Sequence, residues 1–227
     1  MVRYLVAGFL LILSARAQDL EAARDRQDRA ALDRAVTDLA EAAQKQSSDA
    51  PAQYKLALAE SYAAEVAIET RDKNQARTAA ENGIKAAGRA VALKPANAEY
   101  HRILGTLCGQ VVPANALLGA MKYGRCALDE VNKALQLDPN SAAGYLSHGV
   151  GNYYLPPTFG GGVDLAVKDF ERAIQLNPKY AEAYLWLGIA LHKENKNAEA
   201  RKALEKSLDL NPNRVWAKQQ LEKTPAQ

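Results

Sequence analysis

The sequence predicts an all-α fold, a superhelix of four helical hairpins with an additional helix at either end. Three observations predict it. Proline-containing stops recur, their spacing changes regularly, and small residues recur in step with them. Proline ends a helix at the residue before it, and Asp or Asn with a following polar residue starts the next helix. Each stop follows an apolar helical stretch, and the four prolines are Pro95, Pro139, Pro178 and Pro212.

The intervals between these prolines are 44, 39 and 34 residues along the chain. Such periods indicate an array of helix–turn–helix units, each of which buries its apolar face against its neighbours. The extra residues fall between the two helices of a hairpin and exceed the last unit by 12, 10 and 5 residues in the first three units. We therefore expect hairpins that are taller toward the N-terminus, with regular stacking between them.

Glycine and alanine recur at matching places in these units. Two helix axes approach closely only where side chains are small, so we expect Gly105, Gly149 and Gly188 in the first helices to face Ala127, Ala166 and Ala200 in the second. Glycine inside a helix costs roughly 1 kcal/mol relative to alanine, which indicates that packing offsets this cost. The next unit is expected to stack on Ala134, Ala173 and Ser207.

Residues 1–17 have the pattern of a signal peptide and predict export, to the periplasm or the cell exterior. Arg3 precedes the apolar run of residues 5–13, and Ala15-Arg16-Ala17 is a small-x-small cleavage pattern. The run is shorter than the about 20 apolar residues that cross a bilayer, although an uncleaved anchor is an alternative. Cleavage removes Arg3 and Arg16 and no acid, so the net charge falls from +3 to +1. We expect no nucleic-acid partner and no stable membrane span after cleavage.

Residues 18–50 are expected to form an N-terminal helix that covers the first hairpin. Its apolar stripe at helical spacing consists of Leu32, Ala35, Val36, Leu39 and Ala43. The mixed-charge stretch of residues 24–29 is interpreted as a solvated face or a frayed helix start.

The solenoid is expected over residues 51–213, with units at about 52–97, 98–141, 142–180 and 181–214. Residues 111–118 form an unusually apolar insertion in the second unit. In the third unit, residues 155–162 carry three glycines but lack the Lys-Ser/Thr of a phosphate-binding loop, so we expect a structural turn with Phe159 and the prolines packed over the hairpin end. Residues 214–227 are expected to be a capping helix and tail, in which Trp216 and Leu221 cover the last hairpin.

Cys108 and Cys126 are expected on the two helices of the second hairpin. Export would permit a disulfide. We favour two buried thiols, because Cys108 is expected nearer the hairpin tip and a bridge needs α-carbons within about 7 Å.

The repeat signature identifies a family. The last unit places Tyr184, Gly188, Ala200 and Pro212 where the tetratricopeptide-repeat (TPR) pattern has Trp/Tyr, Gly, Ala and Pro, and the chain resembles that family. The two preceding units fit through Gly105, Ala127, Ala134 and Pro139, and through Gly149, Ala166, Phe170, Ala173 and Pro178. The Pro-Pro-x-Phe-Gly-Gly segment at 156–161 is similar to a TPR subgroup of bacterial envelope proteins and the regulator-of-microtubule-dynamics family. The resemblance implies a right-handed superhelix.

The resemblance also implies a concave groove lined by the first helix of each unit, at its second, fifth, ninth, twelfth and thirteenth positions. The candidate partner-binding residues are Arg102, Leu146, Val150, Tyr153, Tyr154, Leu185, Ile189, His192 and Lys193. Counting the first unit from Ala52 gives Gln53, Leu56, Glu60, Ala63 and Ala64. The fifth and ninth positions lack the Lys and Asn with which some TPR proteins grip a C-terminal carboxylate. The apolar floor suits an amphipathic helix or an extended apolar segment, unless the N-terminal helix or neighbouring hairpins already cover it.

No catalytic constellation is present in the sequence. The metalloprotease, nucleophile-elbow and dinucleotide motifs are absent. His101, His148 and His192 occupy different registers of their helices, so we do not expect them to converge on a metal. We expect no enzyme activity, no cofactor and no metal.

The leading hypothesis is therefore a non-enzymatic protein–protein interaction scaffold of the cell envelope, which binds an apolar or amphipathic protein segment. One alternative is a periplasmic small-molecule or lipid carrier whose pocket is enclosed by the long first hairpins and the insertion around Leu117. Another is a structural protein that self-associates.

Overall fold

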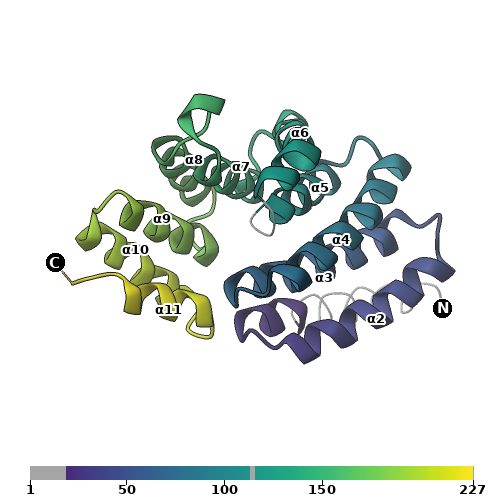
Figure 1. Cartoon of the computed structure of the whole chain (residues 1–227), viewed down its shortest axis with the longest axis horizontal. Helices are drawn as coiled ribbons and strands as arrows, with labels where there is room; N and C mark the ends of the chain where they lie inside the picture. Colours follow the sequence, from purple (N-terminus) through teal and green to yellow (C-terminus); the bar gives the residue numbers. More distant parts are fainter. Residues whose placement is uncertain (1–18, 113–115, 227) are drawn as a thin grey trace, which may run out of the picture.

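A computed structural model describes residues 19–112 and 116–226, and within these ranges the chain is helical without strands (Figure 1). The all-α prediction is confirmed. The predicted signal peptide lies outside the described residues, as do residues 113–115 and the side chain of Leu117 in the apolar insertion.

The helices form four successive hairpins between an N-terminal and a C-terminal helix. A short helix at residues 19–25 precedes α2 (Arg29–Lys45). The hairpins are α3 (Ala50–Glu69) with α4 (Lys73–Leu93), α5 (Ala98–Val111) with α6 (Ala116–Leu137), α7 (Ala142–Tyr154) with α8 (Val163–Leu176), and α9 (Ala181–Lys193) with α10 (Asn197–Leu210). The array ends with α11 (Val215–Lys223).

Side-chain caps explain where several of these helices begin. The side chains of Asp49 and Asp72 accept hydrogen bonds from the first turns of α3 and α4, and those of Asn97 and Ser141 do the same for α5 and α7. Asn177 and Asn211, by contrast, are the residues that end α8 and α10, directly before the prolines.

The N-terminal segment breaks near its start, so the prediction of one helix over residues 18–50 is wrong there. The break lies at residues 26–28, where Gln27 adopts a φ of 53°. Asp28 then starts α2 afresh, because its side chain accepts a hydrogen bond from Ala31 N. The expected apolar stripe packs as predicted at Leu32, which is buried with Ala63 and Val66 of α3 in one cluster.

The first helices of successive hairpins pack against one another, which places them on the inner side of the array, with the second helices outside. Helices α3, α5, α7 and α9 contact one another in sequence, and each packs against its own second helix. At Gly105 and Gly188, an added Cβ would lie about 3 Å from the carbonyl oxygens of Ala127 and Ala200, and at Gly149 it would meet the Phe170 ring. The expected role of the recurring glycines in close helix contact is therefore observed, although Gly149 faces Phe170 rather than Ala166.

The extra residues of each hairpin are accommodated in different ways. In the first hairpin both helices are long, 20 and 21 residues, against 13 and 14 in the last. In the second, the insertion extends α6 to 22 residues while α5 has 14. In the third it forms a 3-10 turn, η2 (Pro157–Phe159), followed by Gly160 and Gly162 at positive φ.

Two expectations about these insertions need correction. Pro156 and Pro157 are exposed and do not pack over the hairpin end, while the side chain of Phe159 lies outside the described residues. Cys108 and Cys126 form a disulfide with a Cα–Cα distance of 5.9 Å, so the preference for free thiols is wrong. Because the insertion lengthens α6 beyond the end of α5, Cys126 stands at the height of Cys108 instead of below it.

Candidate interaction surface

A ladder of polar contacts joins the inner helices along the concave side. Ser61 Oγ on α3 donates to Gln110 Oε1 on α5 at 3.1 Å, and Gln110 Nε2 donates to the Ser61 carbonyl at 3.1 Å. Further along, Arg102 Nη1 donates to Ser147 Oγ on α7 at 3.1 Å, and Thr106 Oγ1 lies 3.0 Å from the same oxygen. These contacts fix the spacing of the inner helices.

The register predicted for the first hairpin is wrong. Gln53, Glu60, Ala63 and Ala64 are buried among other helices and do not line the groove. The helix begins at Ala50, two residues before the alanine from which the positions were counted. Counting from Ala50 moves the fifth, twelfth and thirteenth positions to Tyr54, Ser61 and Tyr62, whose side chains contact α5 and the segment of residues 19–25. Asp49 before Pro51 is the capping signal that could have found this start. Glu65 and Glu69 lie further along α3, outside the counted positions, and pair with Arg214.

Much of the predicted apolar floor is already covered by this chain. Leu185 is 0 % exposed and packs with Leu204 and Ala217, because α11 lies over α9 and α10. Leu146 is buried in the cluster that contains Phe170, and Val150 and Ile189 are half-buried against the same cluster. The prediction that Leu146 and Leu185 are open to a partner is therefore wrong, and neighbouring helices are the cause.

Arg102 is also engaged within the chain. Its Nε and Nη2 each lie 2.6 Å from a carboxylate oxygen of Glu99, and Tyr54 donates a 2.9 Å hydrogen bond to the same carboxylate. This bidentate pair positions the groove wall.

An aromatic cluster remains partly open on the inner side. Tyr153 and Tyr154 end α7, Trp186 lies on α9 and Trp216 on α11. Ring centroids of consecutive members are 5.1 Å apart for Tyr153–Tyr154, 6.2 Å for Tyr154–Trp186 and 5.2 Å for Trp186–Trp216, all edge-on. Tyr154 is 46 % exposed, whereas Trp186 is buried. We call Tyr153, Tyr154, Trp186 and Trp216 the aromatic recess.

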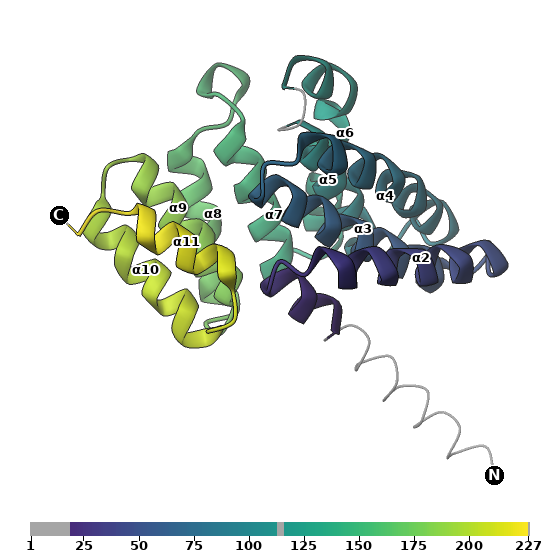
Figure 2. The same ribbon diagram turned by 60° about the horizontal axis from the view of Figure 1, so that its bottom comes forward.

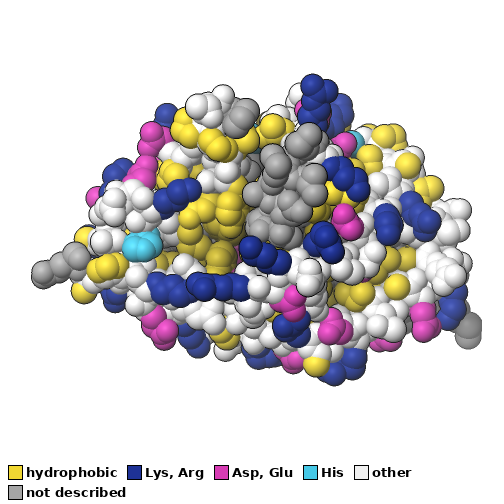
Figure 3. Space-filling model, viewed as in Figure 1, with side chains coloured by type: hydrophobic (Ala, Val, Ile, Leu, Met, Phe, Trp, Pro, Cys, Tyr) yellow, Lys and Arg dark blue, Asp and Glu magenta, His cyan; other side chains and the backbone are white. Residues whose placement is uncertain are grey.

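The environment of Tyr154 shows that it stands in a concavity. Burial raises the pKa of Tyr154 to about 12, with further contributions from Tyr153 and from Glu69 on α3. In Figure 3 the surface is hollowed between α9 and α3, with hydrophobic side chains inside and a row of Lys and Arg side chains along one border.

Lys193 borders this recess and His192 does not join a metal site. Lys193 Nζ lies 4.1 Å from the Tyr153 ring centroid and donates to the Tyr153 carbonyl oxygen at 3.2 Å. His192 Nδ1 lies 2.7 Å from Asn197 Oδ1, while His101 and His148 are paired with Glu130 and Asp169 in separate hairpins. Within the described part of the chain, no group of His, Cys, Asp and Glu could hold a metal ion.

The two ends of the array meet in a buried cluster of charges. Arg214, which directly precedes α11, is 0 % exposed. Its Nη2 lies 2.6 Å from Glu65, 2.5 Å from Glu69 and 3.0 Å from Glu182. Its Nε lies 3.7 Å from Asp25, whose carboxylate also pairs with Arg24 at 2.7 Å. We call Arg24, Asp25, Glu65, Glu69, Glu182 and Arg214 the Arg214 cluster.

The cluster raises the pKa values of some of its members and lowers that of another. Burial lowers the pKa of Arg214, but Glu182, Glu65 and Glu69 outweigh it and hold the pKa above its ordinary value. Burial would raise the pKa of Glu182, but Arg214 and Arg24 keep it lowered. For Glu65 and Glu69 burial prevails over the arginines, and both pKa values are raised. In this cluster, the cost of burying the charges and the attraction between them are both large, and they oppose each other.

The interpretation of residues 24–29 as a solvated charged stretch is wrong for Arg24 and Asp25. Both side chains are largely buried, and Arg24 also lies 4.9 Å above the Tyr62 ring. Figure 2 shows the segment of residues 19–28 between α3 and α11. The sequence predicted neither the cluster nor the closure of the array, because the paired residues are far apart in the chain.

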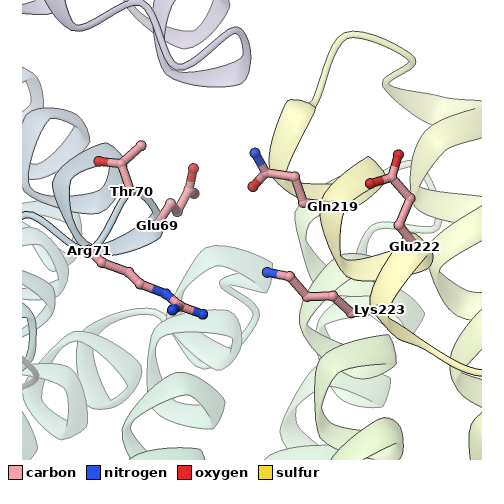
Figure 4. Close-up of a pocket in the computed structure, with 6 residues that line it drawn as sticks. All are labelled: Glu69, Thr70, Arg71, Gln219, Glu222 and Lys223. Carbon is pink, nitrogen blue, oxygen red and sulfur yellow. The ribbon is translucent and has the colours of Figure 1, made fainter.

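Beside the Arg214 cluster lies an open cleft of about 430 Å³ between the α3–α4 turn and α11 (Figure 4). Glu69, Thr70 and Arg71 form one wall, and Gln219, Glu222 and Lys223 form the other. Arg71 and Lys223 extend toward each other across the gap. Among the described residues, no helix has the length and hydropathy needed to cross a bilayer.

Comparison with known families gives two matches that together cover most of the chain. The sequence model of the family "Regulator of microtubule dynamics protein 1-3" matches residues 13–155, and a tetratricopeptide-repeat model matches residues 160–215.

Curated relatives and solved structures give the same repeat type. The chain is 30 % identical over 98 residues to the small glutamine-rich tetratricopeptide repeat-containing protein 2 of Mycosarcoma maydis, and 32 % identical over 91 residues to that of Saccharomyces cerevisiae. These matches cover 43 % and 40 % of this chain, and only 26 % and 25 % of the relatives' own lengths.

Among solved structures, TTC0263, a thermophilic TPR protein of Thermus thermophilus, superposes with a TM-score of 0.64 at 18 % identity, covering 86 % of this chain and 91 % of that one. The HusA haemophore of Porphyromonas gingivalis gives 0.55 at 20 % identity, covering 75 % and 92 %. At these identities the likeness establishes the fold alone.

Proposed function

The chain belongs to the family of regulator of microtubule dynamics protein 1-3 and is a TPR repeat protein, and from this premise we propose that it is a non-enzymatic scaffold that binds a protein partner at the aromatic recess. TPR folds support protein–protein interaction in general. The finer proposal is that the partner contributes an apolar or amphipathic segment, which packs an apolar side chain against Tyr154 beside Lys193.

The exposure of Tyr154 carries this proposal. Most large apolar groups of the predicted groove are covered by α11 or by neighbouring hairpins, but Tyr154 leaves 46 % of its surface open on the inner side. Its ring is held edge-on by Tyr153 and Trp186, so little side-chain entropy remains to be lost on binding. Rigid aromatic anchors of this kind often carry much of the energy of protein interfaces.

The proposal includes a location in the cell envelope. It is supported by the apolar run and small-x-small pattern of residues 1–17, and by the Cys108–Cys126 disulfide, a bond typical of proteins in oxidising compartments.

Site-specific crosslinking in cells tests the binding surface. We expect a photoreactive benzoylphenylalanine at position 154 to yield a discrete crosslinked partner. The same residue at position 184 should yield none, because Tyr184 points elsewhere on α9 and donates to the Pro178 carbonyl. The purified partner should then bind the Tyr154→Ala chain at least about tenfold more weakly than wild type, the loss of a well-packed anchor.

Equal adducts at positions 154 and 184, or an unchanged affinity of the folded Tyr154→Ala chain for the captured partner, would exclude the aromatic recess as the binding surface. Circular dichroism of the Tyr154→Ala chain and of the chains with benzoylphenylalanine at positions 154 and 184 checks that the fold is intact.

A further inference from the structure

Residues 19–28 fill the concave side between the first and last hairpins as a ligand would. Leu20 and Ala23 are buried in one cluster with Ala63 and Val66 of α3. The helix of residues 19–25 is too short to be stable alone in water, where helices below about 12 residues are marginal. Its conformation therefore depends on the groove that holds it.

Two adjacent side chains of opposite charge, Arg24 and Asp25, make the main polar contacts of this segment with the surface around it. Arg24 stacks over Tyr62 at 4.9 Å and lies 3.9 Å from Glu182. Asp25 accepts a 2.7 Å hydrogen bond from Asn211 Nδ2, with Arg214 Nε at 3.7 Å from its other oxygen. Arg24 and Asp25 thus contact different residues of the surface.

Without the segment, the surface that holds it has an excess of negative charge. Glu65, Glu69 and Glu182 surround the single guanidinium of Arg214. A second cation beside Glu65 and Glu182 relieves this excess, and Arg24 is the group that supplies it. The surface therefore selects an arginine at this place by charge, and a neighbouring acid by Asn211 and Arg214.

The short helix of residues 19–25 can leave without unravelling α2. Asp28 caps α2 independently, and the backbone turns at Gln27. Gln27 adds only side-chain contacts at the exit, a 2.8 Å hydrogen bond to Glu69 and one of 3.3 Å from Gln219.

We propose that the surface formed by Tyr62, Glu65, Glu182, Asn211 and Arg214 is a binding site for a short helix of a partner protein that carries an Arg-Asp pair after an apolar turn, and that residues 19–28 occupy this site in cis. The partner presents leucine, alanine, arginine and aspartate with the spacing of Leu20, Ala23, Arg24 and Asp25. A tethered segment acts at an effective concentration of about millimolar, so the partner binds only when it outcompetes the segment. The proposal is independent of the aromatic recess.

A labelled peptide of residues 19–28 tests this site by fluorescence anisotropy with full-length chains. In the Arg24→Glu chain, repulsion from Glu65 and Glu182 displaces the chain's own segment. We expect this variant to bind the peptide at least about tenfold more tightly than wild type. Arg26→Glu is the matched control, because it makes the same charge change at a more exposed position of the same segment. A peptide with its own Arg24→Glu change should bind none of the chains.

Binding to the Arg24→Glu chain that is no tighter than to wild type, or that is matched by Arg26→Glu, would overturn the proposal. Hydrogen exchange of the wild-type chain gives a second reading that does not depend on the variant's folding. Amides of residues 22–28 should exchange at least about tenfold faster than the slowest amides of α3 and α9, through local opening. Equal protection of the segment and these helices would show that it is part of the core and contradict the proposal.

Discussion

Glu60 is a carboxyl group buried inside the first hairpin, 6 % exposed on α3. Burial raises the pKa of Glu60 from about 4.5 to about 7, a hydrogen bond with Asn82 opposes the rise, and Asp33 adds to it. Between these pH values the native state keeps a proton that the unfolded chain releases. Stability therefore falls as the pH rises from about 4.5 to about 7, and the penalty is absent below the lower value.

We predict that Glu60→Gln, which resembles the protonated acid, raises the free energy of unfolding at pH 8 by about 1–3 kcal/mol and leaves it nearly unchanged at pH 4. Urea unfolding at pH 4, 6 and 8 measures the difference. Glu171→Gln on the exposed face of α8 is the control and should have no pH-dependent effect. The same difference from wild type at pH 4 and pH 8 would contradict this account of Glu60.

Glu60 also shows what the sequence could and could not predict at this scale. Its helical environment follows from the periodic pattern, but its side depends on where the helix begins. The count from Ala52 placed Glu60 in the groove, whereas the start at Ala50, capped by Asp49, places it against α4. Tyr54 and Ser61 occupy the inner face instead. A two-residue error turns a helix by more than half a turn, which exchanges buried and exposed faces.

Two glycines of α7, Gly149 and Gly151, allow the effect of close helix packing to be compared with that of helix propensity. A Cβ added at Gly149 would lie 2.6 Å from Phe170 Cε1 and 3.0 Å from Asp169 Cβ, whereas one added at Gly151 would meet nothing within 4 Å. We predict that Gly149→Ala destabilises the chain by about 1–3 kcal/mol through overpacking. Gly151→Ala should stabilise it by up to about 1 kcal/mol, because alanine favours the helix. Urea unfolding of both variants measures the contrast.

Destabilisation by both substitutions, or by neither, would show that the α7–α8 contact does not require glycine at position 149. This contact is of the kind that sequence reasoning can reach, because the glycine and its second-helix neighbours lie in one repeat. The form of an insertion is harder to predict. Extra residues lengthened α6 in one hairpin and made the η2 turn in the next. The Cys108–Cys126 bond followed from that unpredicted lengthening.

At the scale of the whole molecule, the closure of the array could not be predicted from the sequence. The repeats are local and periodic, so their number and order are visible in the chain. The Arg214 cluster joins residues separated by 145 and 149 positions, and Asn211 and Asp25 by 186. No local pattern marks such pairs. Mixed charges at residues 24–29 resemble a solvated surface until the last hairpin is placed against them.

Closure makes Arg214 the residue on which both ends of the array depend. Its removal leaves Glu65, Glu69 and Glu182 together in a buried site, and loss of one partner from a buried charge network costs about 3–5 kcal/mol. We predict this loss for Arg214→Met at pH 8, measured by urea unfolding. Helical circular dichroism should be retained, and the radius of gyration in small-angle scattering should increase as the ends separate. Arg77→Met on the exposed face of α4 is the matched control.

The stability that Arg214→Met loses at different pH values shows whether the charge of Arg214 or its packing holds the two ends of the array together. Without the guanidinium, Glu65 and Glu69 keep their raised pKa values, and Glu182 loses one of the two arginines that lower its pKa. Burial therefore favours the protonated acids as the pH falls toward 4, and the carboxyl groups repel one another less there. The deficit should therefore shrink to about 1 kcal/mol at pH 4 and be largest at pH 8, since stability falls with rising pH when the native state holds more protons. A deficit that is equal at both pH values would mean that Arg214 holds the ends together by packing, and the charge cluster would then not be the cause of closure.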